Sequence, residues 1–121
     1  MPNGPRCEHC AVPSTGSEIY IVGGDTRSVD AFDTAMLEWK ITTTLRDMPE
    51  LRYCSAAAML KKQYLVVVGG HDNNWRATAS CFIFDFSSNH WSLTPASMDM
   101  IQACKGHTVA VLDGKIVVAG G

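Results

Sequence analysis

The residues best suited to chemistry lie near the N-terminus, where Cys7-Glu8-His9-Cys10 places two thiols three positions apart. A pair of this spacing commonly supplies half of a structural zinc site, which needs a second pair of ligands at suitable spacing. The remaining cysteines, Cys54, Cys81 and Cys104, are scattered singly. In an extended strand Cys7 and Cys10 also point to opposite faces. We therefore expect no metal, no redox centre and no cofactor.

Other patterns typical of enzymes are missing from the sequence. His90 and His107 are isolated, and no Ser or Cys carries a local nucleophile signature such as G-x-S-x-G. Pairs of glycines follow strand-like runs. A phosphate-binding loop would require a helix to begin directly after such glycines, and no helix-forming segment follows them. The sequence thus predicts a protein that is not an enzyme.

Composition excludes several further classes. The chain has 121 residues, 46% hydrophobic and 18% charged, with a formal net charge of −2. This composition predicts a folded domain. The sequence lacks the basic stripe that a nucleic-acid-binding surface usually shows. The longest apolar stretch, Tyr64 to Val68, is far below the roughly 20 residues that span a membrane. No secretory signal is visible, so we expect an intracellular, cytoplasmic protein whose five cysteines are free thiols.

Three landmarks repeat along the chain. Strand-like runs end in a glycine pair three times, and the first glycines of the pairs are 46 and 51 residues apart. A Phe-Asp dipeptide followed by Trp, with seven residues from Phe to Trp, occurs twice at an interval of 52. An arginine precedes the first two glycine pairs by 17 residues, and Lys105 precedes the third by 15. The residues of these landmarks are Gly23-Gly24, Gly69-Gly70, Gly120-Gly121, Phe32-Asp33, Trp39, Phe84-Asp85, Trp91, Arg6 and Arg52.

Each repeat is interpreted as four β-strands. In the second repeat we expect strands at about 53–60, 63–68, 79–85 and from Trp91 onward, separated by Gly, Asn, Asp and Ser clusters. Asp113-Gly114 predicts a two-residue hairpin turn in the third repeat. The glycine pairs suit sharp, crowded turns, and the Phe and Trp side chains suit the space between neighbouring sheets. Asp33 and Asp85 are expected to hydrogen-bond the turn that follows each third strand.

This pattern resembles the kelch repeat: a strand ending in Gly-Gly, a variable loop, an aromatic residue with Asp, and then Trp. The resemblance implies an all-β fold of four-stranded antiparallel blades from a kelch-type β-propeller. We predict repeat 1 at residues 1–46, repeat 2 at 47–95 and a partial repeat 3 at 96–121 with two strands. About two and a half blades form an incomplete ring, so we expect a piece of a longer protein or a self-assembling chain.

The resemblance also implies where a partner would bind. In kelch propellers the loop between the second and third strands opens on a face that usually binds proteins or peptides. Trp and Arg are the residue types that dominate binding hot spots, and both occur in the second such loop. The partner-binding candidates are His71, Asp72, Asn73, Asn74, Trp75, Arg76, Arg27, Arg52 and Tyr53. The alternative for Trp75 is that it folds back onto its own blade.

Three functional hypotheses remain open from the sequence. The leading one is a non-catalytic protein–protein interaction module. Its partner would be another protein or peptide, with the missing blades or a second copy of the chain as further possibilities, and neither nucleic acid nor membrane. The second is a segment of a kelch-type enzyme resembling galactose oxidase, whose catalytic residues lie outside this chain. The third is a purely structural piece without a binding face.

Overall fold

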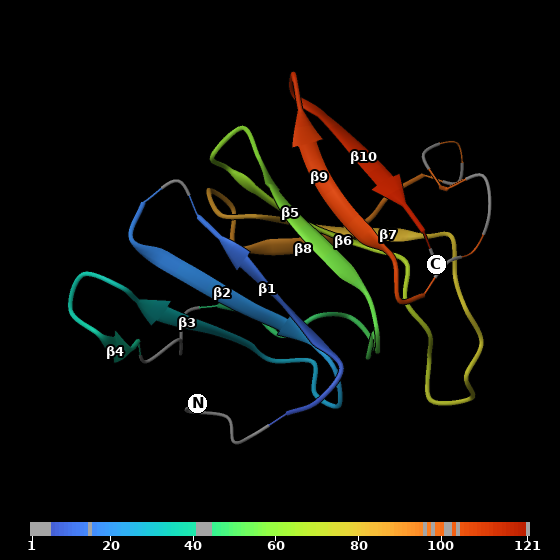
Figure 1. The fold of residues 1–121 in the computed structure, drawn as a ribbon, viewed down its shortest axis with the longest axis horizontal. Helices are drawn as coiled ribbons and strands as arrows, with labels where there is room; N and C mark the ends of the chain where they lie inside the picture. The colour runs from blue at the N-terminus through green and yellow to red at the C-terminus, as the bar shows by residue number, and fades with distance from the viewer. Residues whose placement is uncertain are drawn as a thin grey trace.

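The computed structural model describes residues 6–14, 16–40, 45–95, 97, 99–100, 103 and 105–120. Within these residues, ten strands form three antiparallel sheets in chain order (Figure 1). Blade 1 contains β1 (His9–Pro13), β2 (Glu18–Gly23), β3 (Val29–Asp33) and β4 (Glu38–Trp39). Blade 2 contains β5 (Ala56–Leu60), β6 (Tyr64–Val68), β7 (Cys81–Asp85) and β8 (His90–Leu93). A hairpin of β9 (Thr108–Leu112) and β10 (Lys115–Ala119) follows, so the predicted all-β fold with four-stranded antiparallel blades is confirmed.

Two predicted strand boundaries in blade 2 were wrong. The first strand begins at Ala56 rather than near Tyr53, because Cys54 adopts a left-handed φ of 52° that interrupts an extended chain. Arg52 and Tyr53 instead form isolated bridges with Gly24 and His71. The third strand begins at Cys81 rather than Ala79. The repeat boundaries at 46/47 and 95/96 stay predictions, and the motif residue Gly121 lies outside the described residues.

The core forms where the faces of successive blades meet. The first strands, β1, β5 and β9, lie side by side in Figure 1, and β5 contacts both of the others. Leu65 and Val67 of β6 point toward blade 1, where they pack with Val12 and Val22. Alternate residues of the same strand point toward the β9–β10 hairpin. Because every residue from Leu65 to Val68 is buried, this strand is apolar on both faces, as a central layer requires.

The repeated aromatic residues pair in both blades but differ in burial. Phe84 is buried against Trp91 with ring centroids 5.1 Å apart, and the Trp91 indole donates a hydrogen bond to the Arg46 carbonyl. Phe32 and Trp39 form the equivalent pair at 5.1 Å, yet Trp39 is 37% exposed. The difference arises because Trp91 lies beside blade 1, whereas no described segment covers the outer side of Trp39.

The first glycine pair lies where one blade approaches the next. Gly24 has a φ of 84° and its N–H donates to the Arg52 carbonyl across the blade boundary. A Cβ at Gly24 would collide with the Cys7 carbonyl oxygen, and one at Gly23 would come within 2.8 Å of the Arg52 carbonyl oxygen. A side chain at Gly23 would therefore push blade 2 away, whereas one at Gly24 would push apart two segments of blade 1.

The expected turn hydrogen bonds are present. The Asp33 carboxylate accepts the N–H groups of Ala35 and Met36, and the Asp85 carboxylate accepts the N–H and hydroxyl of Ser87. These bonds lower the pKa of both carboxyl groups. His107, isolated in the sequence, ties the hairpin to blade 2, because its Nε2 lies 2.9 Å from the Val68 carbonyl oxygen.

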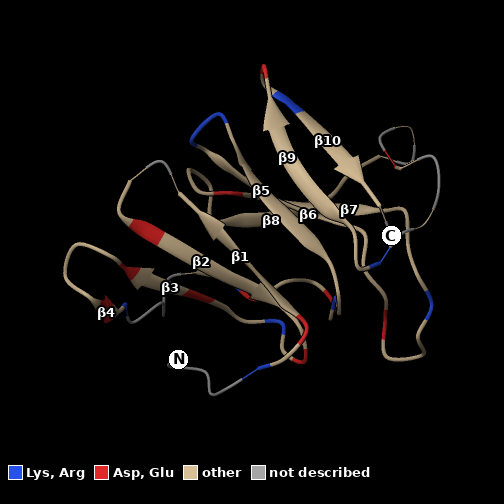
Figure 2. Cartoon of the chain, viewed as in Figure 1, with Lys and Arg blue, Asp and Glu red and all other residues tan. Residues whose placement is uncertain are grey.

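Charged side chains of both signs are scattered over the turns and strands. Figure 2 shows no continuous basic stripe along the described ribbon. No helix of the described residues is long and apolar enough to cross a membrane.

Candidate functional site

The loop from His71 to Arg76, between β6 and β7, is a tightly hydrogen-bonded turn. The Asp72 carboxylate accepts the N–H groups of Asn74 and Arg76, and the Asp72 backbone pairs with Trp75 and Arg76. The hydrogen bonds from Arg76 and Asn74 hold the pKa of the Asp72 carboxyl group below its ordinary value. The loop is therefore braced internally although most of its side chains face solvent.

An aromatic stack fixes the position of Trp75. The Trp75 ring lies on His71 with centroids 4.6 Å apart, and His71 lies on Tyr53 at 5.1 Å, both pairs being nearly parallel. The Lys105 ammonium lies 5.6 Å from the Trp75 ring centroid. Trp75 does fold back onto its own blade, yet its side chain remains 65% exposed. The loop thus presents a large aromatic surface that is already ordered.

Two hollows flank this loop. One, of about 250 Å³, is lined by Trp75, His71, Tyr53 and Asp72 of blade 2 together with Glu8 of blade 1. The other, of about 260 Å³, has a mostly polar lining that includes Arg76, Glu50 and Thr78. A ligand group placed on either side of the loop would contact both an aromatic or basic side chain and hydrogen-bonding groups.

Arg52 borders the second hollow, but its side chain is almost completely buried within blade 2. Its side chain is 3% exposed and donates hydrogen bonds to the Gly69 and Ser80 carbonyl oxygens and to the Ser80 hydroxyl. Arg6 does the same in blade 1, where it bonds the Ser28 carbonyl and hydroxyl. We therefore leave Arg52 out of the proposed contact surface, because the repeated arginine holds the strand ends of its own blade together.

The partners of these arginines belong to a repeated motif that the sequence reasoning missed. Thr26-Arg27-Ser28 and Thr78-Ala79-Ser80 are 52 residues apart, the same interval as the Phe-Asp dipeptides. In each copy the Ser N–H donates to the Thr hydroxyl, and the Ser hydroxyl contacts the arginine. The shared interval is the signal that could have revealed this motif.

One position of this arginine site differs between the blades. In blade 1 Asp30 accepts from Arg6 at 2.5 Å, and both side chains are almost completely buried. In blade 2 the position 52 residues later is Phe82, and the Arg52 guanidinium lies 4.4 Å from its ring centroid. The arginine is thus held by an ion pair in blade 1 and by a cation–π contact at the same repeat position in blade 2.

The other candidates occupy different places. Asn73 and Asn74 are exposed in the loop, and Tyr53 is half-buried beneath the aromatic stack. Arg27 is exposed on blade 1, with its guanidinium 3.4 Å from the Pro49 carbonyl. Lys105 occupies the repeat position of Tyr53 rather than that of Arg52. The residue that follows each one shows this, because the Gly106 N–H donates to the Cys54 carbonyl just as the Cys54 N–H donates to the Glu8 carbonyl.

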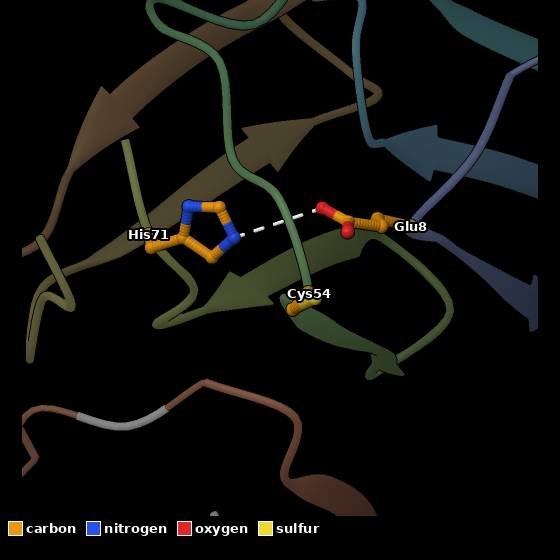
Figure 3. A group of neighbouring side chains, drawn as sticks. All are labelled: Glu8, Cys54 and His71. Atoms are coloured by element: carbon orange, nitrogen blue, oxygen red, sulfur yellow. Dashed lines mark ion pairs between the residues drawn. The ribbon is translucent and has the colours of Figure 1, made fainter. Parts of the chain in front are cut away.

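A second cluster lies in the crevice where blade 1 meets blade 2. One ligand atom each of Glu8, Cys54 and His71 lies within 4.8 Å of the other two, and Figure 3 shows the three side chains converging from separate segments. Burial and the neighbouring Glu8 carboxylate raise the pKa of the Cys54 thiol. No sequence pattern pointed to this cluster, because Glu8 lies in the first repeat, 46 residues before Cys54, and His71 follows Cys54 by 17 residues in the second repeat.

Cys7 and Cys10 lie in different environments. Cys7 is exposed, whereas burial raises the pKa of the Cys10 thiol to about 11 and the thiol lies 3.5 Å from the Val22 carbonyl oxygen. All the cysteines that the structure describes, Cys7, Cys10, Cys54 and Cys81, are free thiols.

The family model described as the KLHDC2/KLHL20/DRC7 Kelch-repeats domain matches residues 8–121. The chain belongs to the kelch-repeat family. This assignment agrees with the repeated glycine pairs and with the two four-stranded blades.

Two curated Arabidopsis thaliana proteins are similar to this kelch chain. F-box/kelch-repeat protein SKIP20 is 25% identical over 94% of the chain, and F-box/kelch-repeat protein At2g44130 is 24% identical over 87%. The chain spans only 29% and 26% of the lengths of these relatives. The solved structure of YjhT matches 98% of the chain at 22% identity with a TM-score of 0.81, and the match covers 34% of that protein. This likeness supports the fold.

Proposed function

We propose that this kelch chain is a non-catalytic protein–protein interaction module that binds its partner through the 71–76 loop. The observation that carries the proposal is the exposed Trp75, stacked on His71 and flanked by Arg76. An aromatic side chain that is ordered before binding loses little conformational entropy when a partner covers it. Trp and Arg are also the residue types most enriched at the centres of protein interfaces.

The proposed contact surface comprises the exposed loop residues and the hollows beside them. Asn73 and Asn74 offer hydrogen-bonding amides at its tip, and Arg76 offers a guanidinium at its side. Arg27 on blade 1 is a peripheral member. A peptide or protein loop that carries an apolar group for Trp75 and an acidic or carbonyl group for Arg76 would match this surface.

An enzyme is the second candidate function, and fewer observations favour it. Both curated relatives are named F-box/kelch-repeat proteins, and this name refers to their domains and not to a catalytic activity. We therefore retain the interaction module over the galactose-oxidase-like alternative. The partner is proposed to be a protein or peptide, and an intracellular location remains a prediction that fits the free thiols.

A site-specific photo-crosslinker tests the proposal without knowing the partner. A benzophenone amino acid replaces Trp75 in one variant and Met36 in another, in the complete protein and in its native cell. Met36 is 67% exposed and lies in the β3–β4 turn, so it is matched in exposure but remote from the loop.

We expect a discrete protein adduct from position 75 and none of the same mass from position 36. Trp75→Ala, made separately, should abolish co-purification of the protein found in that adduct. Adducts of equal yield at both positions, or adducts at position 36 alone, would contradict the loop as the contact site.

A further inference from the structure

Glu8 and Cys54 occupy equivalent positions in neighbouring blades. Both have a left-handed φ, 56° and 52°, and the Cys54 N–H donates to the Glu8 carbonyl at 3.0 Å. The Gly106 N–H donates to the Cys54 carbonyl at 2.9 Å in the same way. This repeating backbone link holds the two side chains next to each other at the crevice between the blades.

The His71 ring completes the cluster with a fixed orientation. Its Nδ1 lies 2.8 Å from the Asp72 carbonyl oxygen, which can only accept, so Nδ1 carries a proton. In the neutral ring Nε2 is then left with a free lone pair. Stacking between Tyr53 and Trp75 prevents the ring from rotating away. A histidine whose other nitrogen donates to a backbone carbonyl is the usual arrangement of a metal ligand.

The Nε2 atom of His71 lacks a hydrogen-bond partner. Nε2 is buried within a side chain that is 3% exposed, and its nearest acidic atom is the Glu8 Oε2 at 3.6 Å. That distance is longer than an ordinary hydrogen bond. It is slightly longer than the separation of about 3.3–3.5 Å that a nitrogen and an oxygen ligand have around a tetrahedral zinc ion.

We propose that Glu8, Cys54 and His71 form a binding site for Zn²⁺ that joins blade 1 to blade 2 and to the 71–76 loop. The site would use Glu8 oxygen, Cys54 sulfur and His71 Nε2, and a water molecule would fill the fourth position on the side of the adjoining cavity. A thiolate, an imidazole and a carboxylate together suit Zn²⁺ better than the hard cations Mg²⁺ and Ca²⁺. Binding releases the thiol proton of Cys54 to solvent.

This proposal differs from the expectation of no metal, which rests on the spacing of Cys7 and Cys10. It goes beyond the proposed interaction function, since partner binding at Trp75 does not require it. The alternative is a plain ion pair between Glu8 and protonated His71, which would leave the Cys54 thiol unused.

Titration of the metal-free chain with Co²⁺, under a non-thiol reductant, distinguishes these possibilities. Thiolate coordination produces a thiolate-to-cobalt charge-transfer band, and addition of Zn²⁺ should remove it by displacement. Cys54→Ser is the main variant, because Ser is nearly the same size and retains the fold, as circular dichroism would verify. Cys7→Ser is the matched control, since Cys7 is an exposed cysteine at the mouth of the same cavity.

We expect one Co²⁺ per chain, with the band lost in Cys54→Ser, weakened in Glu8→Gln and retained in Cys7→Ser. Zn²⁺ should also raise the melting temperature of the original chain, which it would not do for a site formed by unfolded thiols. The proposal is overturned if no band forms, if Cys54→Ser keeps the band, or if the urea-unfolded chain binds equally well.

Discussion

Single residues in this chain show how one repeat position can be filled by different chemistry. Arg6 and Arg52 hold the ends of their blades through the same carbonyl and hydroxyl acceptors. Their remaining neighbour is a carboxylate in one blade and an aromatic ring in the other. The two blades therefore share the hydrogen bonds of the guanidinium to the strand ends but differ in the side chain that packs beside it.

Replacing Arg52 tests this role. Arg52→Met keeps much of the apolar stem but removes the guanidinium donor from the Gly69 carbonyl and from the Ser80 carbonyl, the second of which keeps the Gly69 N–H. The loss should lower the free energy of unfolding by about 3 kcal/mol. Arg76→Met is the matched control, because Arg76 is exposed, and it should change stability by less than about 0.5 kcal/mol. Urea unfolding followed by circular dichroism measures both. Equal losses would show that Arg52 is not a structural tie.

Because the Cys10 thiol is buried, we predict that the chain loses stability at alkaline pH. Burial raises the Cys10 pKa from the ordinary 9.0 to about 11, and burial also raises the pKa values of Cys81 and Tyr20. The unfolded chain therefore loses the Cys10 proton first. The contribution of Cys10 is complete below pH 9 and declines as pH rises toward 11, by about 2 kcal/mol.

The measurement is the free energy of unfolding from pH 8 to pH 11, for the original chain and for Cys10→Ala. The variant should show a smaller decline over this range. The same slope in both chains would exclude Cys10 as the titrating group.

At the scale of elements, Gly24 allows the segment before β1 to lie close to the end of β2 in blade 1. Gly24→Ala should destabilise the chain by more than about 3 kcal/mol, because its φ is left-handed and its Cβ would meet the Cys7 backbone. Gly114 in the β9–β10 turn has a similar φ of 73° but open space around it, so Gly114→Ala should cost about 1 kcal/mol. Thermal unfolding of the two variants, side by side, gives the comparison. A smaller effect at Gly24 than at Gly114 would show that the close approach of the Cys7 backbone is not the cause.

The elements were largely predictable from the sequence because they repeat locally. Glycine pairs, Phe-Asp dipeptides and the Asp113-Gly114 turn mark strand ends at short range, and the observed strands follow them. The predicted start of β5 was wrong because the left-handed turn at Cys54 contains no glycine that would have indicated it. Contacts between blades were not predictable, since Glu8 and His71 meet only after two repeats have stacked. The exposed position of Trp75 likewise depends on the stack beneath it.

At the scale of the whole chain, apolar side chains are exposed on the face of the β9–β10 hairpin. Leu112 and Val117 lie on the face of the hairpin turned away from blade 2, where they are 64% and 49% exposed. We expect the isolated 121-residue chain to associate through this face. Val117→Lys should reduce the molar mass measured by light scattering, whereas Leu93→Lys, at an exposed leucine of β8, should not. A monomeric, β-rich original chain at high concentration would contradict this.

The most direct test of the central claim is the affinity of Trp75→Ala for the partner found by crosslinking, measured by titration calorimetry against Met36→Ala. Loss of a preordered aromatic hot spot should weaken binding by about 2 kcal/mol, or roughly 30-fold, while the Met36 variant should bind as the original chain does. Equal affinities for the two variants, with both folded, would contradict the proposal that the 71–76 loop is where this kelch module binds.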